Sequence, residues 1–600
     1  MGGQSVTWID QESLLLHQRR FDLEKLLAFV FAAYVIVRLF VHIRAAWSFT
    51  TDDAYITLRY ARHLAEGHGI VWNVDEPVPV EGYSNFLFVV LGAIALWLGL
   101  DAVLCLKGLC VAALLGTCFL LHRLTRLWLG PVLSVIPALF LIAYRGTSWW
   151  TVSGLETAVY QLLVVGAVTA CIVGLGFKPV GSPAGQLEAG PDPNALRYSS
   201  RLLALAGFLI FLLSITRPEG PLILVALMAG MVVHVGARLW RYYRLGDRNG
   251  LARLLRESVK ATALPIGCFA LPFAAYFAWR YQYFGRVFPN TVYCKSGFLE
   301  DPSRLNREFW NVAKPFVLLS LIQRPGRFDA RHAILWSVPL LYAAILHGAD
   351  PVIAHYLRHY LAAFALLLVT AAVGFSNLFR LLVPVALFGV ELLLELEEQL
   401  ARLVRKHLPS IQSLYGLVQL PARGLRHLHR LSRLTAVQHA LIAFIALSWV
   451  GVDGTWMDRT MQSESLRYSV RMKVREEVSA YLNAHLSSED LFLIGDAGLV
   501  PFLTRTRVLD AFCLNSIEMT TPPINMSPER FVDMIFQRMP KMLITSTRSD
   551  DELALSRLLN VQPVLLQHPE FQRRYQLAKR MGSKSARIYY WLYERRPAPE

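Results

Sequence analysis

Runs of apolar residues recur along this chain and constrain its fold more than any other feature, because several are long enough to cross a hydrocarbon core about 30 Å thick. Such runs lie near residues 26–47, 102–121, 130–144, 155–175, 202–217, 219–237, 261–281, 311–323, 332–347, 356–376 and 436–452. In a chain of 600 residues that is 54% hydrophobic, this pattern predicts a mainly α, polytopic transmembrane protein. We expect about eleven transmembrane helices and, because the chain is longer than they require, a soluble part as well.

Two further apolar runs are less regular. The apolar run at residues 86–100 is short for a transmembrane span, and Asp101 ends it. We therefore expect this segment to lie in the membrane interface. Residues 379–394 end among several glutamates and remain ambiguous as a span.

Basic residues cluster between the apolar runs, which explains the formal net charge of +16. If residues 86–100 do not cross the membrane, the basic segments 122–126, 238–260 and 402–433 all fall on one side, which the positive-inside rule makes cytoplasmic. The N-terminus would lie on that side too. Anionic lipid headgroups are the expected partners of these segments, and nucleic acid is not. The polar N-terminus shows no cleavable signal peptide, so the first run should remain as an anchor.

This orientation divides the chain into two domains. We expect a transmembrane domain over residues 1–452, with its first extracytoplasmic loop at 48–101, and a soluble extracytoplasmic α/β domain over 453–600. In the second domain a helical pattern at 466–486 precedes strand candidates at 491–494, 508–510, 541–545 and 586–592. Alternating helices and strands favour βα units over a sandwich.

The seven cysteines give little sign of a structural framework. Five lie in apolar runs, where cysteine behaves as a small hydrophobe. Only Cys294 and Cys513 fall in aqueous segments, and no CxxC pair exists, so neither a zinc site nor a disulfide framework is indicated. A bridge between Cys294 and Cys513 is the one pairing open to the chain, but we do not favour it.

Two adjacent carboxylates, Asp52 and Asp53, follow the first apolar run. An ionised carboxylate within reach of a hydroxyl can act as a general base, and partial burial would raise its pKa toward that task. Alternatively, the pair caps a helix that starts at residue 54. Arg59 and Arg62 lie three residues apart on the same helix, where they could grip a phosphate or extend to lipid headgroups.

Later polar groups offer similar alternatives. Glu81, Tyr83 and Asn85 combine a carboxylate, a phenol and an amide, which suits a sugar, or they form a turn before a helix. Glu156 stands at the edge of a span, where an ionisable residue is a candidate for function, although the tryptophans before it are also typical of an interfacial belt. Arg217 and Glu219 interrupt an apolar stretch, as a helix break or as a substrate contact.

The segment 282–296 is rich in aromatic and polar groups, including Asn290 and Tyr293, and its Lys295 could meet a phosphate as a point charge. His68 lies close to the acidic pair, but the spacing is not diagnostic of a metal site. A divalent cation stays open, and no other cofactor is indicated. The P-loop, GxSxG and HExxH motifs are absent, so nucleotide hydrolysis, a hydrolase elbow and a zincin are unsupported.

Taken in order, these elements resemble the GT-C superfamily of membrane glycosyltransferases, and within it the branch of the mycobacterial terminal arabinofuranosyltransferase. The matching segments are Asp52-Asp53-Ala54-Tyr55, Gly67-His68-Gly69, Val80-Glu81-Gly82-Tyr83-Ser84-Asn85, Ser153–Thr157, Arg217–Gly220, Pro289–Lys295 and Gly495–Pro501. Asp350 stands where that branch has a Gly-Gly-Asp motif, although this chain reads Gly-Ala-Asp. The resemblance covers nearly the whole chain, and its strength is in the ordered set.

The resemblance implies an inverting transfer of one sugar, arabinofuranose in the named branch, from a polyprenyl-phosphate donor to a hydroxyl of an extracytoplasmic cell-envelope glycan or glycoprotein. Asp52 or Asp53 would be the general base. The residues implied to meet the donor phosphate are Arg59, Arg62, Arg217 and Lys295. The residues implied to contact substrate are Tyr55, His68, Glu81, Tyr83, Asn85, Glu156, Glu219, Asn290, Tyr293 and Asp350. The resemblance also implies a multi-pass protein of the bacterial inner membrane.

Two other functions compete with this interpretation. A flippase or transporter of lipid-linked sugars would place ionisable groups near the bilayer midplane, often in internal repeats. Here the polar motifs gather on one face and no repeat is visible. A sensor with a periplasmic domain would not need the first-loop residues. We therefore favour the enzyme.

Overall fold

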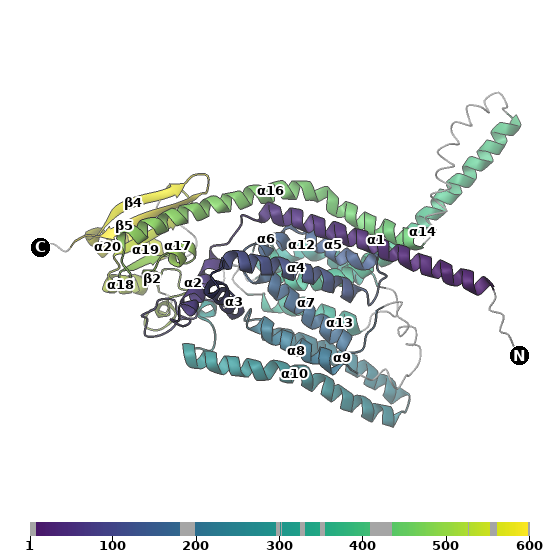
Figure 1. The fold of residues 1–600 in the computed structure, drawn as a ribbon, viewed down its shortest axis with the longest axis horizontal. Helices are drawn as coiled ribbons and strands as arrows, with labels where there is room; N and C mark the ends of the chain where they lie inside the picture. The colour runs from purple at the N-terminus through teal and green to yellow at the C-terminus, as the bar shows by residue number, and fades with distance from the viewer. Residues whose placement is uncertain are drawn as a thin grey trace.

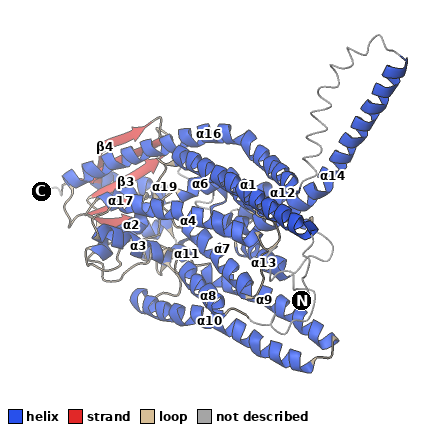
Figure 2. Cartoon of the chain, turned by 45° about the vertical axis from the view of Figure 1, so that its right-hand side comes forward, coloured by secondary structure: helices blue, strands red, loops and turns tan. Residues whose placement is uncertain are grey.

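The computed structural model describes residues 8–179, 198–295, 301, 303–323, 330–348, 355–407, 435–525, 527–551 and 561–597. The described chain is a large helical body with a smaller domain, built on a mixed sheet, at one end (Figures 1 and 2). It is a mainly helical, multi-span membrane protein with a C-terminal α/β domain, as the sequence predicts.

The helical body contains the following elements. Its first half comprises α1 (Trp8–Ala46), α2 (Asp53–Ala65), α3 (Phe86–Trp97), α4 (Ala102–Thr125), η1 (Leu133–Val135), α5 (Ile136–Ala143), α6 (Arg145–Thr151) and α7 (Thr157–Gly174). Its second half comprises α8 (Ser200–Ser214), α9 (Gly220–Arg244), α10 (Arg248–Phe284), α11 (Asn290–Lys295), α12 (Arg304–Leu321), α13 (Ala330–Ile345), η3 (His355–Tyr360), α14 (Leu361–His407) and α16 (Thr435–His485).

Within the described residues, six helices are long and apolar enough to cross a membrane. They are Leu23–Ala46, Ala102–Thr125, Thr157–Gly174, Gly220–Arg244, Arg248–Phe284 and His355–Leu382. Four shorter apolar helices accompany them, and each of the expected spans overlaps a helix. The run at 86–100 forms the 12-residue α3, which packs against α2 and α4, and the ambiguous segment 379–394 lies inside α14.

The core of the helical body centres on α7, which is buried along most of its length. It packs against α4, α8 and the first half of α14, while α10 lies at the outer edge (Figure 1). Asp101, which follows the short apolar run, caps α4: its side chain accepts a 3.0 Å hydrogen bond from the Leu104 amide. The same aspartate therefore sets where the next span begins. α3 itself ends at Trp97 with Leu98 as its C-cap, and Gly99 follows in the left-handed conformation, with a φ of 72°.

The C-terminal domain is built on a five-stranded sheet in the order β2-β1-β3-β5-β4. The strands are β1 (Leu491–Ile494), β2 (Arg507–Asp510), β3 (Met542–Thr547), β4 (Tyr575–Ser583) and β5 (Ile588–Arg595). β1 pairs in parallel with β2 and β3, and β5 runs antiparallel to β3 and β4. The helices of this domain are α17 (Leu499–Leu503), η5 (Glu518–Thr520), α18 (Pro528–Arg538), α19 (Val561–Gln567) and α20 (Pro569–Arg574).

Four of the five strands match the predicted ones, and β4 was missed. β4 is an edge strand whose side chains are mostly exposed and polar, so it lacks the apolar alternation that marks a half-buried strand. The carboxyl ends of β1 and β3 lie at the same edge of the sheet, since these strands are parallel. The turn after β1 carries Asp496, and Arg548 follows β3.

One helix joins the two domains. α16 runs unbroken for 51 residues, beside α1 at its start and against α17, β4 and β5 at its end (Figure 1). The sequence predicts a span at 436–452 and a separate helix at 466–486; the structure instead has a single helix, and the expected boundary at residue 453 falls inside it.

A disulfide also joins the domains. Cys294, in α11, is bonded to Cys513, in the C-terminal domain. We did not favour this bridge from the sequence. The two residues are 219 positions apart, and nothing local in the sequence brings them together. The structure corrects that expectation: the first part of the same segment is hydrogen-bonded to the C-terminal domain through the backbone carbonyls of Cys513 and Leu514.

Candidate active site

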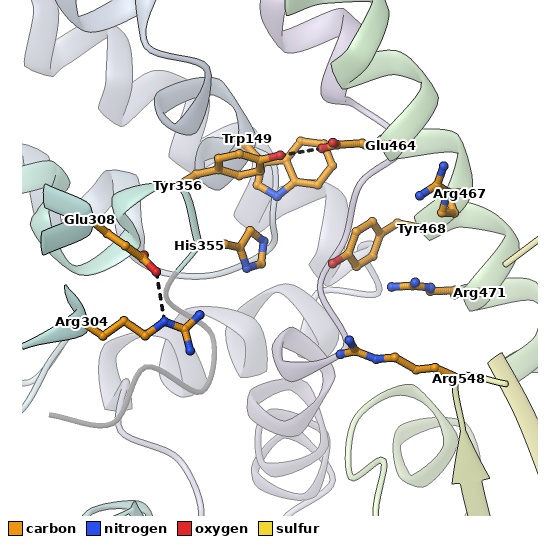
Figure 3. Close-up of a pocket in the computed structure, with 10 residues that line it drawn as sticks. All are labelled: Trp149, Arg304, Glu308, His355, Tyr356, Glu464, Arg467, Tyr468, Arg471 and Arg548. Carbon is orange, nitrogen blue, oxygen red and sulfur yellow. Dashed lines mark hydrogen bonds and ion pairs between the residues drawn. The ribbon is translucent and has the colours of Figure 1, made fainter. Parts of the chain in front are cut away.

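Two adjoining cavities lie beside the C-terminal domain, and the first of them is where the first loop meets that domain. The first, of about 280 Å³, is lined by Asp52 and Asp53 together with groups from α16 and the turn after β1; we call it the acidic cavity. The second, of about 520 Å³, carries four arginines; we call it the arginine cavity (Figure 3). The two share His355, Tyr468, Arg471 and Arg548. Ligand sites of open α/β sheets commonly form outside the carboxyl ends of parallel strands, as here.

Asp52 faces the C-terminal domain. Its Oδ1 accepts a 2.9 Å hydrogen bond from the Leu499 amide, and its Oδ2 a 3.2 Å bond from the Gly498 amide. The guanidinium of Arg475 lies 3.2 Å from Oδ1. Asp52 occupies the N-cap position of α2, yet its side chain makes no capping hydrogen bond to that helix. The capping alternative therefore does not explain this carboxylate.

Burial raises the pKa of Asp52 to about 6, although Arg475 opposes the shift and the neighbouring Asp496 and Asp53 add to it. A carboxyl with such a pKa is ionised near neutral pH and is a stronger base than an ordinary aspartate. Asp53 begins α2 and lines the same cavity. The two carboxylates of the acidic pair therefore open onto the same cavity.

Helix α16 lines one wall of the arginine cavity. Glu464, Arg467, Tyr468 and Arg471 recur at intervals of three and four residues and so share one face of the helix (Figure 3). Arg471 donates a 2.8 Å hydrogen bond to the Ala586 carbonyl and stacks over Tyr468. Sequence reasoning missed this stripe, although the spacing of Arg467, Tyr468 and Arg471 is visible within the predicted helix at 466–486.

The other walls come from distant parts of the chain. Arg304 and Glu308, on α12, form an ion pair at 3.1 Å. Tyr356 donates a 2.8 Å hydrogen bond to Glu464, and Arg548 enters from the end of β3 (Figure 3). Both carboxylates of the cavity thus have partners, and among the described lining residues Arg467 and Arg548 form no ion pair. The cavity suits an anionic group such as a phosphate.

Glu156 stands at the centre of a buried ionic network. Its Oε1 lies 3.2 Å from Arg217 and 3.3 Å from Arg358, and its Oε2 accepts a 3.1 Å hydrogen bond from Asn85. Arg217 also pairs with Glu219 at 2.6 Å. The guanidinium of Arg217 therefore faces two carboxylates inside the protein, and none of these residues lines the two cavities.

Glu81 forms a buried bidentate pair with Arg280, with Nε–Oε1 and Nη2–Oε2 distances of 3.0 and 2.5 Å. The ring of Tyr83 is buried edge-on against Tyr60, 4.9 Å between centroids. These two predicted substrate residues hold the first loop against α10 and α2.

Arg59 and Arg62 hold the first loop against the C-terminal domain. The buried guanidinium of Arg59 donates to the carbonyls of Trp72, Pro501, Thr504 and Thr506, and Arg62 donates to those of Phe502 and Thr504. The guanidinium N–H groups that we predicted to bind a phosphate thus donate to backbone carbonyls instead. The sequence did not reveal this, because all of these carbonyls except that of Trp72 lie more than 400 residues away.

The remaining predicted residues lie apart from the two cavities. The Asn290 amide donates to the Cys513 and Leu514 carbonyls at 2.8 and 3.0 Å, and Tyr293 lies under the Arg286 guanidinium. The Tyr55 ring packs on Phe502, and His68 is exposed. The Lys295 side chain and the whole of Asp350 lie outside the described residues.

A metal site would need several carboxylates, histidines or cysteines around one point. Among the residues that the structure describes, no group of three or more is arranged to hold a metal ion. The acidic cavity itself contains Asp52, Asp53 and Asp496, with Arg475 between two of them.

Comparisons with known proteins agree with this architecture. ArnT from Cupriavidus metallidurans in the apo state is similar over 94% of this chain and 97% of its own, with 13% identity and a TM-score of 0.51. The chain has the GT-C fold. At this identity the similarity shows the fold alone.

Two other solved structures are similar at lower scores. ArnT from the same organism bound to undecaprenyl phosphate gives a TM-score of 0.48 at 13% identity, over 94% and 97% of the two chains. The oligosaccharyltransferase of Archaeoglobus fulgidus tethered with an acceptor peptide gives 0.46 at 12% identity, over 86% and 69%. Residues 461–593 match a family model described as a domain of unknown function, DUF8728. No curated protein matches the sequence.

Proposed function

We propose that this protein is a membrane glycosyltransferase that moves one sugar from a polyprenyl-phosphate donor to a hydroxyl of an acceptor. The observation that carries the proposal is the adjacency of the two cavities: a carboxylate pair opens onto the same space as an arginine-lined anion site. General-base chemistry and phosphate recognition are the two parts such a transfer requires. The GT-C fold is consistent with this role.

The proposed step uses both cavities. The acceptor hydroxyl gives its proton to Asp52 or Asp53 as its oxygen attacks the anomeric carbon from the side opposite the phosphate. The bond from that carbon to the phosphate oxygen breaks, and the polyprenyl phosphate leaves with the bonding electrons, with inversion at the anomeric carbon. Arg471 and Arg548, shared by both cavities, would stabilise the charge that develops on the phosphate.

This assignment changes the proposed roles of several residues. Arg471, Arg548 and Arg467 replace Arg59, Arg62 and Arg217 as the donor-phosphate residues, because the latter three are bound to carbonyls or to buried carboxylates. We further propose arabinofuranose as the sugar and a cell-envelope glycan or glycoprotein as the acceptor. The protein would lie in the bacterial inner membrane, with residues 453–600 and the loop 48–101 on the extracytoplasmic side.

The test is transfer by the purified protein in lipid nanodiscs, using radiolabelled polyprenyl-phosphate sugars and a hydroxyl acceptor. Asp52→Asn and Asp53→Asn should each reduce the rate by about 100-fold or more, because a general base typically contributes 10²–10⁴-fold. Asp101→Asn is the matched control: it removes a first-loop carboxylate that only caps α4, and asparagine caps equally well.

Full activity in both variants of the pair would overturn the proposal. So would movement of the intact lipid-linked sugar across the bilayer without transfer, which is the outcome expected of a flippase. For the wild type, the rate should fall as the pH drops through about 6, because protonated Asp52 cannot accept a proton.

A further inference from the structure

Arg475 is a buried cation that the proposed step does not use. It lies on α16, one helical turn beyond Arg471 and on the same face. Only 9% of its side chain is exposed. Burial of a guanidinium costs free energy unless carboxylates pair with it, so Arg475 needs anionic partners around its side chain.

That arrangement is a bridge between two carboxylates. Nε of Arg475 lies 3.2 Å from Oδ1 of Asp52, and Nη2 lies 3.0 Å from Oδ2 of Asp496. The same Asp496 oxygen accepts a hydrogen bond from the hydroxyl of Tyr590, on β5. A continuous chain of contacts therefore runs from β5, through Asp496 and Arg475, to the acidic pair.

We propose that Arg475 is a positioning residue for the transfer: it fixes the orientation of Asp52 and keeps this carboxylate ionised. This inference rests on the proposed function, in which Asp52 is part of the base. In this proposal the membrane domain supplies the carboxylate of Asp52, and the C-terminal domain supplies the guanidinium that keeps this carboxylate able to accept a proton.

The charge balance supports this role. Asp52, Asp53 and Asp496 line one cavity, and like charges at such range favour protonation of at least one of them. The titratable and charged groups that face Asp52 or line its cavity are Tyr468, Arg471 and Arg475 from α16, Asp53 and Tyr55 from α2, Asp496 after β1, Tyr590 from β5, His355 from η3 and Arg548 after β3. Among these, only Arg475 forms an ion pair with Asp52 in the described structure.

Orientation is the second part of the role. The backbone on the N-terminal side of Asp52 is fixed by a 3.0 Å hydrogen bond from the Thr51 amide to the Ser153 carbonyl. The side chain is fixed from the other domain by Arg475 and by the amides of Gly498 and Leu499. Without Arg475, two neutral amides would remain to hold a carboxylate with adjacent negative charges.

The experiment compares Arg475→Met and Arg475→Lys with Lys473→Met, which removes an exposed cation two residues away on the same helix. Loss of Arg475 should raise the pKa of Asp52, so the acidic limb of the pH–rate profile should move upward by about one pH unit or more. The rate at pH 6 should fall about fivefold or more, because the ionised fraction of Asp52 at that pH would drop from about one half to about one tenth. Arg475→Lys should recover part of both effects, and Lys473→Met should change neither.

A second readout does not depend on activity. Carbodiimide labelling of protonated Asp52, followed by peptide mass spectrometry across a pH series, reports its midpoint directly. The midpoint should rise in Arg475→Met. If the wild type shows no transfer but this midpoint shifts, the proposed function fails and the positioning contact stands.

A lower rate with unchanged profile and midpoint would overturn the inference, since a purely structural role predicts that result. If Arg475→Met does not fold, Asp496→Asn and Tyr590→Phe provide the test. They loosen the far side of the bridge and should reduce the rate while the thermal midpoint stays within a few degrees. The rates are compared at a pH where Asp52 is ionised in every variant, because Asp496→Asn also removes a negative charge that raises the pKa of Asp52. Wild-type rates in both Asp496→Asn and Tyr590→Phe would likewise contradict the positioning role of Arg475.

Discussion

A single methyl group at Gly498 should separate the two domains at the acidic pair. A Cβ at this position would lie 2.2 Å from the backbone oxygen of Asp52, 2.3 Å from its Cγ and 2.4 Å from its Oδ2. Ordinary van der Waals contact begins at 3.4 Å, so the backbone of Asp52 and that of Gly498 must move apart by about 1.2 Å. The obstacle is main chain, which cannot rotate away as a flexible side chain can.

A misplacement of about 1 Å at a reacting group can reduce the rate about 100-fold. We therefore expect Gly498→Ala to lower kcat by about two orders of magnitude, with a smaller change in KM for the donor, because the arginine cavity is formed by other residues. The assay is steady-state transfer in nanodiscs, with the thermal midpoint measured on the same preparations.

Gly495→Ala is the matched comparison, because a Cβ there would meet nothing within 4 Å. It should retain most of the wild-type rate. The reasoning is refuted if Gly498→Ala retains full activity, or if the two variants lose activity equally. A large drop in the thermal midpoint of Gly498→Ala alone would show instead that the contact mainly supports the fold.

Three other predictions rest on contacts described above. Arg471→Gln and Arg548→Gln should each raise KM for the polyprenyl-phosphate donor several-fold, with little effect on KM for a neutral acceptor; equal changes in both constants would contradict the phosphate assignment. Cys294→Ser should destabilise the protein by about 2–5 kcal/mol, seen as a lower thermal midpoint that reductant no longer changes; identical melting with and without the bridge would show that it contributes nothing. Glu81→Gln leaves Arg280 buried without its anionic partner and should cost about 3–5 kcal/mol of stability, measured by denaturation in nanodiscs; an unchanged midpoint would mean that the pair is not needed.

The membrane helices could be predicted because hydropathy is a local property. Each expected span depends only on the residues within it, and each overlaps a helix. The strands with buried alternating residues were equally visible, whereas β4 was not, because its exposed polar side chains resemble those of a loop. Contacts between segments far apart in the chain were not predictable in this way.

The site shows this limit clearly. The acidic pair was found from its position after the first span, but its partners Gly498, Leu499 and Arg475 lie more than 400 residues away. Arg59 was assigned to a phosphate because a guanidinium suits one; only the fold shows that carbonyls of the C-terminal domain bind it. The arginines of α16 carried a readable signal, their common helical face, which the sequence interpretation did not use.

The unbroken course of α16 has a consequence for how this protein can vary. A flexible linker tolerates insertions and deletions, whereas in a helix each residue adds about 1.5 Å and turns the remainder of the helix by about 100°. Removing one residue between the span and Arg467 would rotate Arg471 and Arg475 off the wall that they form. This connection therefore tolerates no change in its number of residues. The length of α16, and not the soluble domain, sets the distance between the bilayer and the acidic cavity.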